Sequence, residues 1–404
     1  MEKNIKAISG LKGQKLLDAI KVRSLLIHEI THFLDTTTSV WGLEYTYRKA
    51  RLIRAIELNQ QHEQPLSVFH LNTAELDSHL SLLTNSREGL SGSILKHKID
   101  IDDVFGPVLS MLYFRNNEEI HQLPISMLAL LEGHATANEF LRRLKDIESL
   151  KGDERIVAMR IAETEFSDHL DDSRLTEYSA LLYLTRIHFP ELSLRHLLRL
   201  FCAITTFTLN VSGLDIARIA NRMGFQNPIA GPTLAQDMRR GGSRQIIAFK
   251  LIIALSNWTK EDGEEYVGLL QSDPYRLIVK FFKIHFDHKL INAVNLELIP
   301  LLNWLKPYNK WYPDFEIFSE SISYNRWRIL KKPIGEHEFS ELKLMSIILN
   351  EDGSAISFPN RSKYDSLKIF ENYLPVMSKL ENMMRNNPSK KFFMPYEAIP
   401  SYML

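Results

Sequence analysis

The chain has 404 residues, which is enough for one large domain or for two to three domains of ordinary size. Apolar residues make up 45% and charged residues 24%, as in globular proteins rather than in disordered chains. The 49 Lys and Arg residues equal the 49 Asp and Glu residues in number, so no net charge would attract nucleic acid or an anionic membrane.

Cysteine usage and hydropathy bear on the compartment. The single cysteine, Cys202, excludes an intramolecular disulfide and favours a reducing environment. The polar stretch from Met1 to Gln14 is not followed by the apolar core of a secretion signal. No segment approaches the roughly 20 uncharged apolar residues of a membrane span. We therefore expect a soluble, cytoplasmic protein.

The first predicted element is an amphipathic helix from Lys15 to Leu34, where apolar residues recur at spacings of three and four. We expect it to end in the run 35–39, because Asp, Thr and Ser side chains compete for backbone hydrogen bonds. A second helix is predicted from Trp41 or Gly42 to about Gln60.

The next part of the chain is of mixed character. Segments 67–71 and 108–114 are rich in strand-forming residues and predict short strands within a small β element between about residues 65 and 115. A strong helical pattern follows from Ile125 to about Leu150. The segment 150–154 is predicted to be a connection.

Helical patterns dominate the rest of the chain. They predict helices at about 155–165, 173–188, 191–209, 213–224, 243–256, 259–270, 290–306, 317–331, 338–350 and 363–386, with prolines between several of them. The predicted fold is therefore mainly α. We expect an N-terminal unit over residues 1–150 and a helical region over 151–404 that binds a substrate, a protein partner or a second copy of the chain.

The chemistry is concentrated in the first helix, which reads His28-Glu29-Ile30-Thr31-His32. Residues four apart lie one above the other on a helix, roughly 6 Å apart, so both imidazoles can bind one zinc ion at about 2.0–2.1 Å. Glu29 points about 100° away from His28, where it can take a proton from a metal-bound water. This pattern predicts a zinc site with a catalytic base.

A hydrolytic zinc ion usually has a third protein ligand. Glu132 is the preferred candidate, because a carboxylate within the apolar stretch of the 125–150 helix is costly unless it is paired or metal-bound. Small neighbours, Gly133 among them, would let this helix approach the first one closely. His134 is the alternative ligand. Glu139 and Asp35 are candidates for hydrogen bonds to the ligand imidazoles.

These motifs resemble those of the gluzincin metallopeptidases, the thermolysin-like and aminopeptidase-like zinc enzymes. The resemblance covers about 130 residues, from the His28–His32 motif to Glu132-Gly133-His134-Ala135. It implies a zincin-like N-terminal fold with Zn²⁺ bound by His28, His32 and Glu132. It also implies that Glu29 is the general base and that a protein or peptide is the substrate.

A hydrolase of this kind also needs a hydrogen-bond donor for the oxyanion. Tyr45 and Tyr47 follow the metal helix, and His121 precedes the Glu132 helix. His134 is a further candidate. The sequence does not rank these four side chains.

Two other functions stay open at this point. The chain could keep the metal helix as a regulatory or interaction protein that cleaves nothing. The segment 214–225 resembles a helix-turn-helix, and Arg239, Arg240 and Arg244 follow it, which would suit a DNA-associated factor. The balanced charge argues against nucleic acid as a partner. A zinc peptidase with a narrow substrate, regulatory or defence-related, is the preferred hypothesis.

Overall fold

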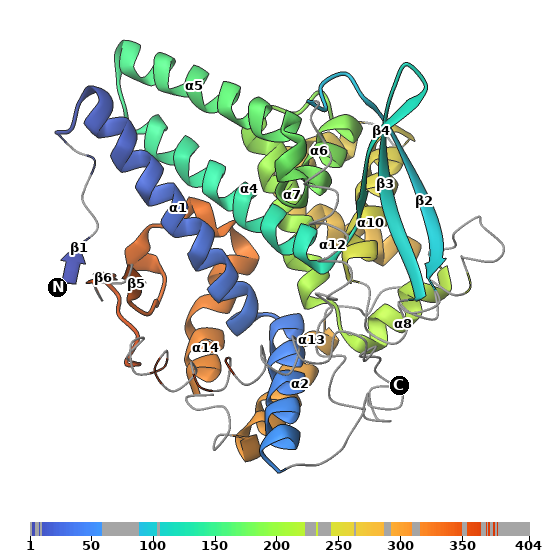
Figure 1. Ribbon diagram of the computed structural model, residues 1–404, viewed down its shortest axis with the longest axis vertical. Helices are drawn as coiled ribbons and strands as arrows, with labels where there is room; N and C mark the ends of the chain where they lie inside the picture. Colours follow the sequence, from blue (N-terminus) through green and yellow to red (C-terminus); the bar gives the residue numbers. More distant parts are fainter. Residues whose placement is uncertain are drawn as a thin grey trace.

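The computed structural model of the chain describes residues 10–58, 89–102, 106–222, 244–261, 264–286, 292–308, 316–349 and 354–364, together with 2–4 and a few single positions. Helices account for most of these residues, so the predicted mainly α class is confirmed (Figure 1). Two small three-stranded sheets accompany the helices. Within this part of the chain, no helix is both long enough and apolar enough to cross a membrane.

Helix α1 (Gly13–Thr38) contains the motif with the two histidines and extends past its predicted end at Leu34. The hydroxyl of Thr38 donates to the backbone carbonyl of Leu34 at 2.5 Å, so this side chain follows the helical pattern instead of ending it. The helix still ends within the predicted run. The hydroxyl of Ser39 then accepts a backbone N–H from α2 (Val40–Glu57).

Helix α4 (Met127–Glu148) begins after Ser126, whose hydroxyl caps it by accepting a backbone N–H at 3.1 Å. It lies beside α1 and runs antiparallel to it, with Arg23 bound to Asp146 at 2.8 Å (Figure 1). Three further helices pack around α4: α5 (Gly152–Asp171), α6 (Thr176–His188) and α7 (Leu194–Asn210).

One sheet is the predicted β element. It consists of β2 (Ile94–Asp102), β3 (Gly106–Arg115) and β4 (Glu118–Pro124), paired antiparallel in that order. The strand predicted at 108–114 is confirmed within β3, whereas the one predicted at 67–71 lies outside the described residues. The element continues to Pro124, beyond its predicted limit, because a two-residue turn reverses the chain. Asn116 and Asn117 form that turn with φ of 53° and 65°.

The remaining helices mostly follow the prediction. They are α8 (Gly213–Arg222), α10 (Arg244–Glu261), α11 (Glu264–Ser272), α12 (Pro274–His285), α13 (Asn292–Leu305) and α14 (Glu316–Lys331), with short 3₁₀ turns η2 (Ser173–Leu175) and η3 (Lys306–Tyr308). Helix α12 is not among the predicted helices, because a proline such as Pro274 can also mark a break between helices. Pro274 instead occupies the first turn of the helix, where its missing N–H costs nothing, and Asp273 caps it.

The helix predicted at 338–350 is wrong. This segment contains the 3₁₀ turn η5 (Phe339–Glu341) and strand β5 (Ile347–Leu349), and η4 (Ile334–Glu336) precedes it. Two consecutive β-branched residues favour the strand over the helix. The strand pairs with β6 (Ser354–Ser357), which in turn pairs parallel with β1 (Glu2–Asn4). The helix predicted at 363–386 lies almost wholly outside the described residues.

Helix α1 contributes to two cores at successive positions along its length. Near its start, Leu16 and Ile20 join the main hydrophobic core, which extends from Leu16 to Phe282 and includes the β2–β4 sheet and α4. Further along, Ile27 and Ile30 join a second core made with the segment around Phe339. A third core unites α2 with α13 and α14. The predicted division at residue 150 falls between α4 and α5 and stays a prediction. The main core contains side chains from both sides of that position.

Candidate metal centre

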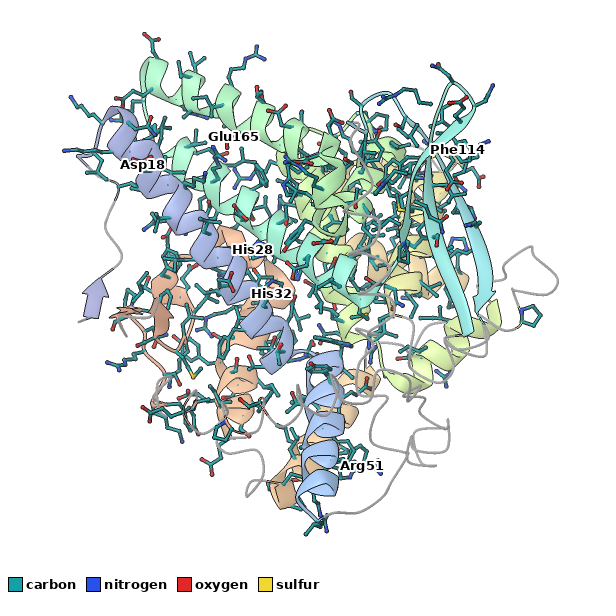
Figure 2. All side chains as sticks on the ribbon, in the orientation of Figure 1. Asp18, His28, His32, Arg51, Phe114 and Glu165 are labelled. Carbon is teal, nitrogen blue, oxygen red and sulfur yellow. The ribbon has the colours of Figure 1, made fainter. Side chains whose placement is uncertain are left out.

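The two motif histidines lie one turn apart on α1, near the centre of the view in Figure 2. Their ring centroids are 5.0 Å apart. The α4 helix brings Glu132 to both of them, and its Oε2 lies 3.3 Å from Nε2 of His28 and 3.3 Å from Nε2 of His32. The three ligand atoms all lie within 4.8 Å of one another.

This donor set fits a zinc ion. Two ligand atoms bound at about 2.0–2.1 Å to a tetrahedral zinc ion are separated by about 3.3 Å. Both Nε2–Oε2 distances, 3.3 Å each, match that separation. Two imidazoles and one carboxylate also leave one of the four coordination positions open, as hydrolytic zinc sites do.

The cluster lies near the surface. The side chains of His28 and Glu132 retain 14% and 17% of their full exposure, and that of His32 retains 30%. The histidines and the glutamate are therefore fixed by their surroundings on one side and reachable by a ligand on the other.

Glu139, seven residues after Glu132 and on the same face of α4, fixes the orientation of His28. Its Oε2 lies 3.1 Å from Nδ1 of His28, on the side of the ring opposite the cluster. A carboxylate at Nδ1 holds the proton there and directs Nε2 towards the metal position. This arrangement agrees with the role predicted for Glu139.

The charges in the cluster are strongly coupled. Burial disfavours the charged form of His28, but hydrogen bonds and attraction from Glu132 and Glu139 outweigh it and raise its pKa to about 9. Burial likewise disfavours the Glu132 carboxylate, yet His28 and His32 lower its pKa to about 2. The metal-free cluster therefore contains an imidazolium paired with carboxylates, and a bound cation would replace a proton.

His134, the alternative ligand, is not part of the cluster. Its Nδ1 lies 2.8 Å from Oδ2 of Asp35, and both side chains are buried. Residues two apart point to nearly opposite sides of a helix, so Glu132 and His134 cannot both face α1 in the same way. Asp35 thus orients His134 rather than a ligand imidazole, and the pair joins the end of α1 to α4.

Gly133 serves a different contact from the one predicted. A Cβ at this position would lie 3.2 Å from the ring of Phe201, so the missing side chain makes room for α7. The close approach of α4 to its neighbour α7 is therefore what Gly133 permits, rather than the approach of α4 to α1.

Glu29 is exposed, next to the two histidines on α1. Its negative charge contributes to raising the pKa of Tyr178 on α6. Glu29 is thus available to accept a proton from a water molecule at the open position.

Tyr178 is the residue that the sequence analysis missed. It lies on α6, with its ring centroid 6.3 Å from that of His28. Burial and the charges of Glu132, Glu177 and Glu29 raise its pKa, so its hydroxyl stays protonated at neutral pH. A neutral phenol at this position can donate a hydrogen bond to an oxyanion. No local pattern connects it with the motif, which lies almost 150 residues earlier.

His169 of α5 lies next to Tyr178. Its ring lies 6.5 Å from that of Tyr178, and its buried Nε2 has no hydrogen-bond partner among the described residues. Burial lowers its pKa, against the attraction of Glu139. His169 is therefore neutral at pH 7, unlike His28.

The three other predicted donors lie elsewhere. Tyr45 stacks on Trp41, with ring centroids 5.3 Å apart, and burial raises its pKa to about 12. Tyr47 packs beside Trp304. His121 is buried on β4, where its Nε2 shares a hydrogen bond of 3.2 Å with the hydroxyl of Thr176. The fold thus does not bring these side chains into the cluster.

The segment considered for DNA binding is described only in part. Residues 213–222 form α8, whereas Arg239 and Arg240 lie outside the described residues. Arg244 is buried and binds Glu44 at 2.8 Å, so it cannot reach a phosphate. Arg244, one of the three arginines that suggested DNA binding, is therefore a core residue.

Comparisons with protein-family models, with curated proteins and with solved structures find no match for this chain. Function must therefore be inferred from the chemistry of the cluster. Of the predicted site residues, the fold brings His28, His32 and Glu132 together with Glu139 beside His28, and Glu29 lies next to His28 on α1. It adds Tyr178.

Proposed function

We propose that this chain is a zinc-dependent peptidase in which His28, His32 and Glu132 hold the metal and Glu29 is the general base. The observation that carries the proposal is the meeting of the three ligand atoms within 4.8 Å, contributed by two helices that are 100 residues apart in sequence. An ordinary ion pair needs only one histidine beside the carboxylate. Here the Nε2 atoms of both histidines lie 3.3 Å from the same carboxylate oxygen, which suits binding of one shared cation better than a simple ion pair.

Each side chain has a distinct role. When bound, zinc supplies a Lewis acid for the scissile carbonyl and lowers the pKa of water to about 7. Glu29 accepts the proton of the attacking water and passes it to the leaving group. Tyr178 donates a hydrogen bond to the oxyanion that develops on the carbonyl oxygen. Glu139 keeps the proton of His28 on Nδ1.

The same base makes cleavage of an amide substrate possible. An amine is a poor leaving group until it is protonated, and Glu29 holds a proton once it has deprotonated water. Glu29 is exposed and Tyr178 is half-buried, so solvent reaches both side chains.

The experiment combines metal analysis with cleavage of a quenched fluorescent peptide library. The purified chain should contain about one zinc per molecule, and His32→Ala should lose it. Glu29→Gln should keep the zinc but cleave at least about 100-fold more slowly, as expected for loss of a general base. Glu163→Gln, on an exposed side of α5, is the matched control and should behave as the unchanged chain.

The metal analysis and the cleavage assay can each refute a different part of the proposal. Absence of zinc in the unchanged chain would refute the metal site. Equal cleavage by the Glu29→Gln variant would refute the assigned base. Zinc without any cleavage would leave the alternative, a metal-binding regulatory protein.

A further inference from the structure

A second feature lies away from the metal cluster, between the β2–β4 sheet and two helices. It is a cavity of about 340 Å³, within the size range of ligand sites. Its walls are mainly apolar, and they come from β2, β3, α6 and α10: Leu95, Met111, Leu184, Ile187, Phe249 and Ile253.

The cavity reaches the open edge of the sheet. Five consecutive residues, 93–97, line it, although side chains of neighbouring strand residues point to opposite faces. The lining must therefore include the edge of the strand, where backbone groups lie. Strand β2 is the outer strand of its sheet and, among the described residues, pairs with β3 alone. Its other edge presents backbone N–H and C=O groups that only an extended chain can match in series.

The mouth of the cavity is apolar and accessible. Two of its apolar lining residues, Ile94 and Ile187, retain 62% and 43% of their full exposure. The hydroxyl of Ser93, another lining residue, is buried without a hydrogen-bond partner in the described part of the chain. Exposed apolar side chains and a buried hydroxyl without a partner both cost free energy. A ligand with apolar and hydrogen-bonding groups would lower that cost.

The surroundings of the cavity are basic. Lys96 lines it directly. Desolvation and the nearby ammonium of Lys250 lower the pKa of His97, and desolvation and Lys260 do the same for His188. Both imidazoles line the cavity, so lysines surround it, and carboxylates of a ligand would be attracted.

We propose that this cavity binds an extended polypeptide segment, which adds to the edge of β2 that no described strand pairs with and inserts an apolar side chain flanked by acidic residues. That strand edge selects an extended backbone, the cavity selects the apolar side chain, and the lysines select the acidic neighbours. The proposal goes beyond the metal chemistry and does not depend on it. Tyr178 and His188 lie ten residues apart on α6, so the two sites are separated by about 15 Å along the helix.

The test measures binding of a fluorescein-labelled octapeptide of alternating Asp and Leu residues to the complete chain by fluorescence polarisation. We expect saturable binding that is the same with and without zinc. Ile187→Ser and Ile94→Ser should each weaken it about tenfold, because each removes apolar contact at the mouth. Ile284→Ser is the matched control, since Ile284 is 53% exposed on α12 and does not line the cavity, and should leave binding unchanged.

Two altered peptides test the backbone and the charge. A peptide N-methylated at alternate residues keeps its side chains but loses the hydrogen bonds to a strand edge, and it should bind at least about tenfold more weakly. A peptide of alternating Lys and Leu residues should also bind more weakly. Equal binding of the N-methylated peptide, or equal effects of Ile187→Ser and Ile284→Ser, would overturn the proposal. Binding of dodecanoate at this site without binding of the peptide would overturn it as well.

Discussion

His28 faces a carboxylate at each ring nitrogen, Glu132 at Nε2 and Glu139 at Nδ1. Zinc needs a neutral imidazole with Nε2 free, whereas the metal-free cluster stabilises the doubly protonated ring. The carboxylates raise the pKa of His28 to about 9, although burial acts in the opposite direction. Metal and proton therefore compete for the same atom.

This competition predicts a pH dependence. Below pH 9 the metal-free His28 is protonated, so zinc binding must displace a proton and becomes tighter as the pH rises. The apparent Kd for zinc should fall about tenfold between pH 7 and pH 8 and level off near pH 9. Competition with a chromophoric chelator, corrected for the protonation of the chelator, measures this. A Kd that is equal at pH 7 and pH 8 would contradict the prediction.

Glu139→Gln should change both the zinc affinity at the plateau and the pH at which the plateau is reached. At the plateau, zinc should bind about 10–100-fold more weakly, because the carboxylate that orients the imidazole is lost. The profile should also level off at a lower pH, since one of the two carboxylates that raise the pKa of His28 is gone. A variant with an unchanged profile would show that Glu139 is only a surface partner of His28. Glu163→Gln again provides the control.

Helix α4 is fixed on another face by the C-terminal segment around η4. The amide of Asn138 accepts the N–H of Gly335 at 2.9 Å. Arg142 and Lys145 donate to the backbone carbonyls of residues 337 and 336 at 2.8 and 2.7 Å. These three polar side chains are one turn or less apart along α4, so the segment lies directly on the helix that carries Glu132.

Gly335→Ala tests this contact. A Cβ would lie 2.1 Å from the backbone oxygen of Asn138, so the segment would have to move away from α4. We expect a loss of about 1–3 kcal/mol in the free energy of unfolding, measured by denaturant titration. Gly268→Ala on α11 is the control, because nothing lies within 4 Å of its Cβ position. It should stabilise the chain by about 0.5–1 kcal/mol, and equal effects of the two substitutions would contradict the prediction.

The main core joins parts of the chain on both sides of residue 150. Leu130 and Leu141 of α4 belong to it, as do Leu197 and Phe201 of α7. Because α4 is covered by α6 and α7, a chain that ended at residue 150 would expose much of its own core.

A fragment of residues 1–150 therefore tests the predicted domain division. We expect it to show no cooperative thermal transition, because the apolar face of α4 lacks its partners. The complete chain should unfold in one transition as followed by circular dichroism. A fragment that melts cooperatively would contradict this expectation and would establish the division at residue 150.

Periodicity in the sequence was sufficient to predict most helices, because apolar residues repeat with the helical period wherever one face is buried. It failed where one residue type is compatible with two structures, and where a short strand depends on pairing with a distant segment. Pro274 can break a helix or begin one, and only Asp273 before it points to the second. Strands β5 and β6 are three and four residues long, too short for a period to be recognised.

The sequence by itself determined the pair His28 and His32 and the place of Glu29, because a helix fixes the geometry of residues up to four apart without help from the rest of the chain. Only the tertiary structure decided that Glu132 rather than His134 meets that pair, and that Tyr178 of α6 lies beside it. Those contacts depend on how α1, α4 and α6 pack around the shared core, which long-range contacts fix and local spacing does not.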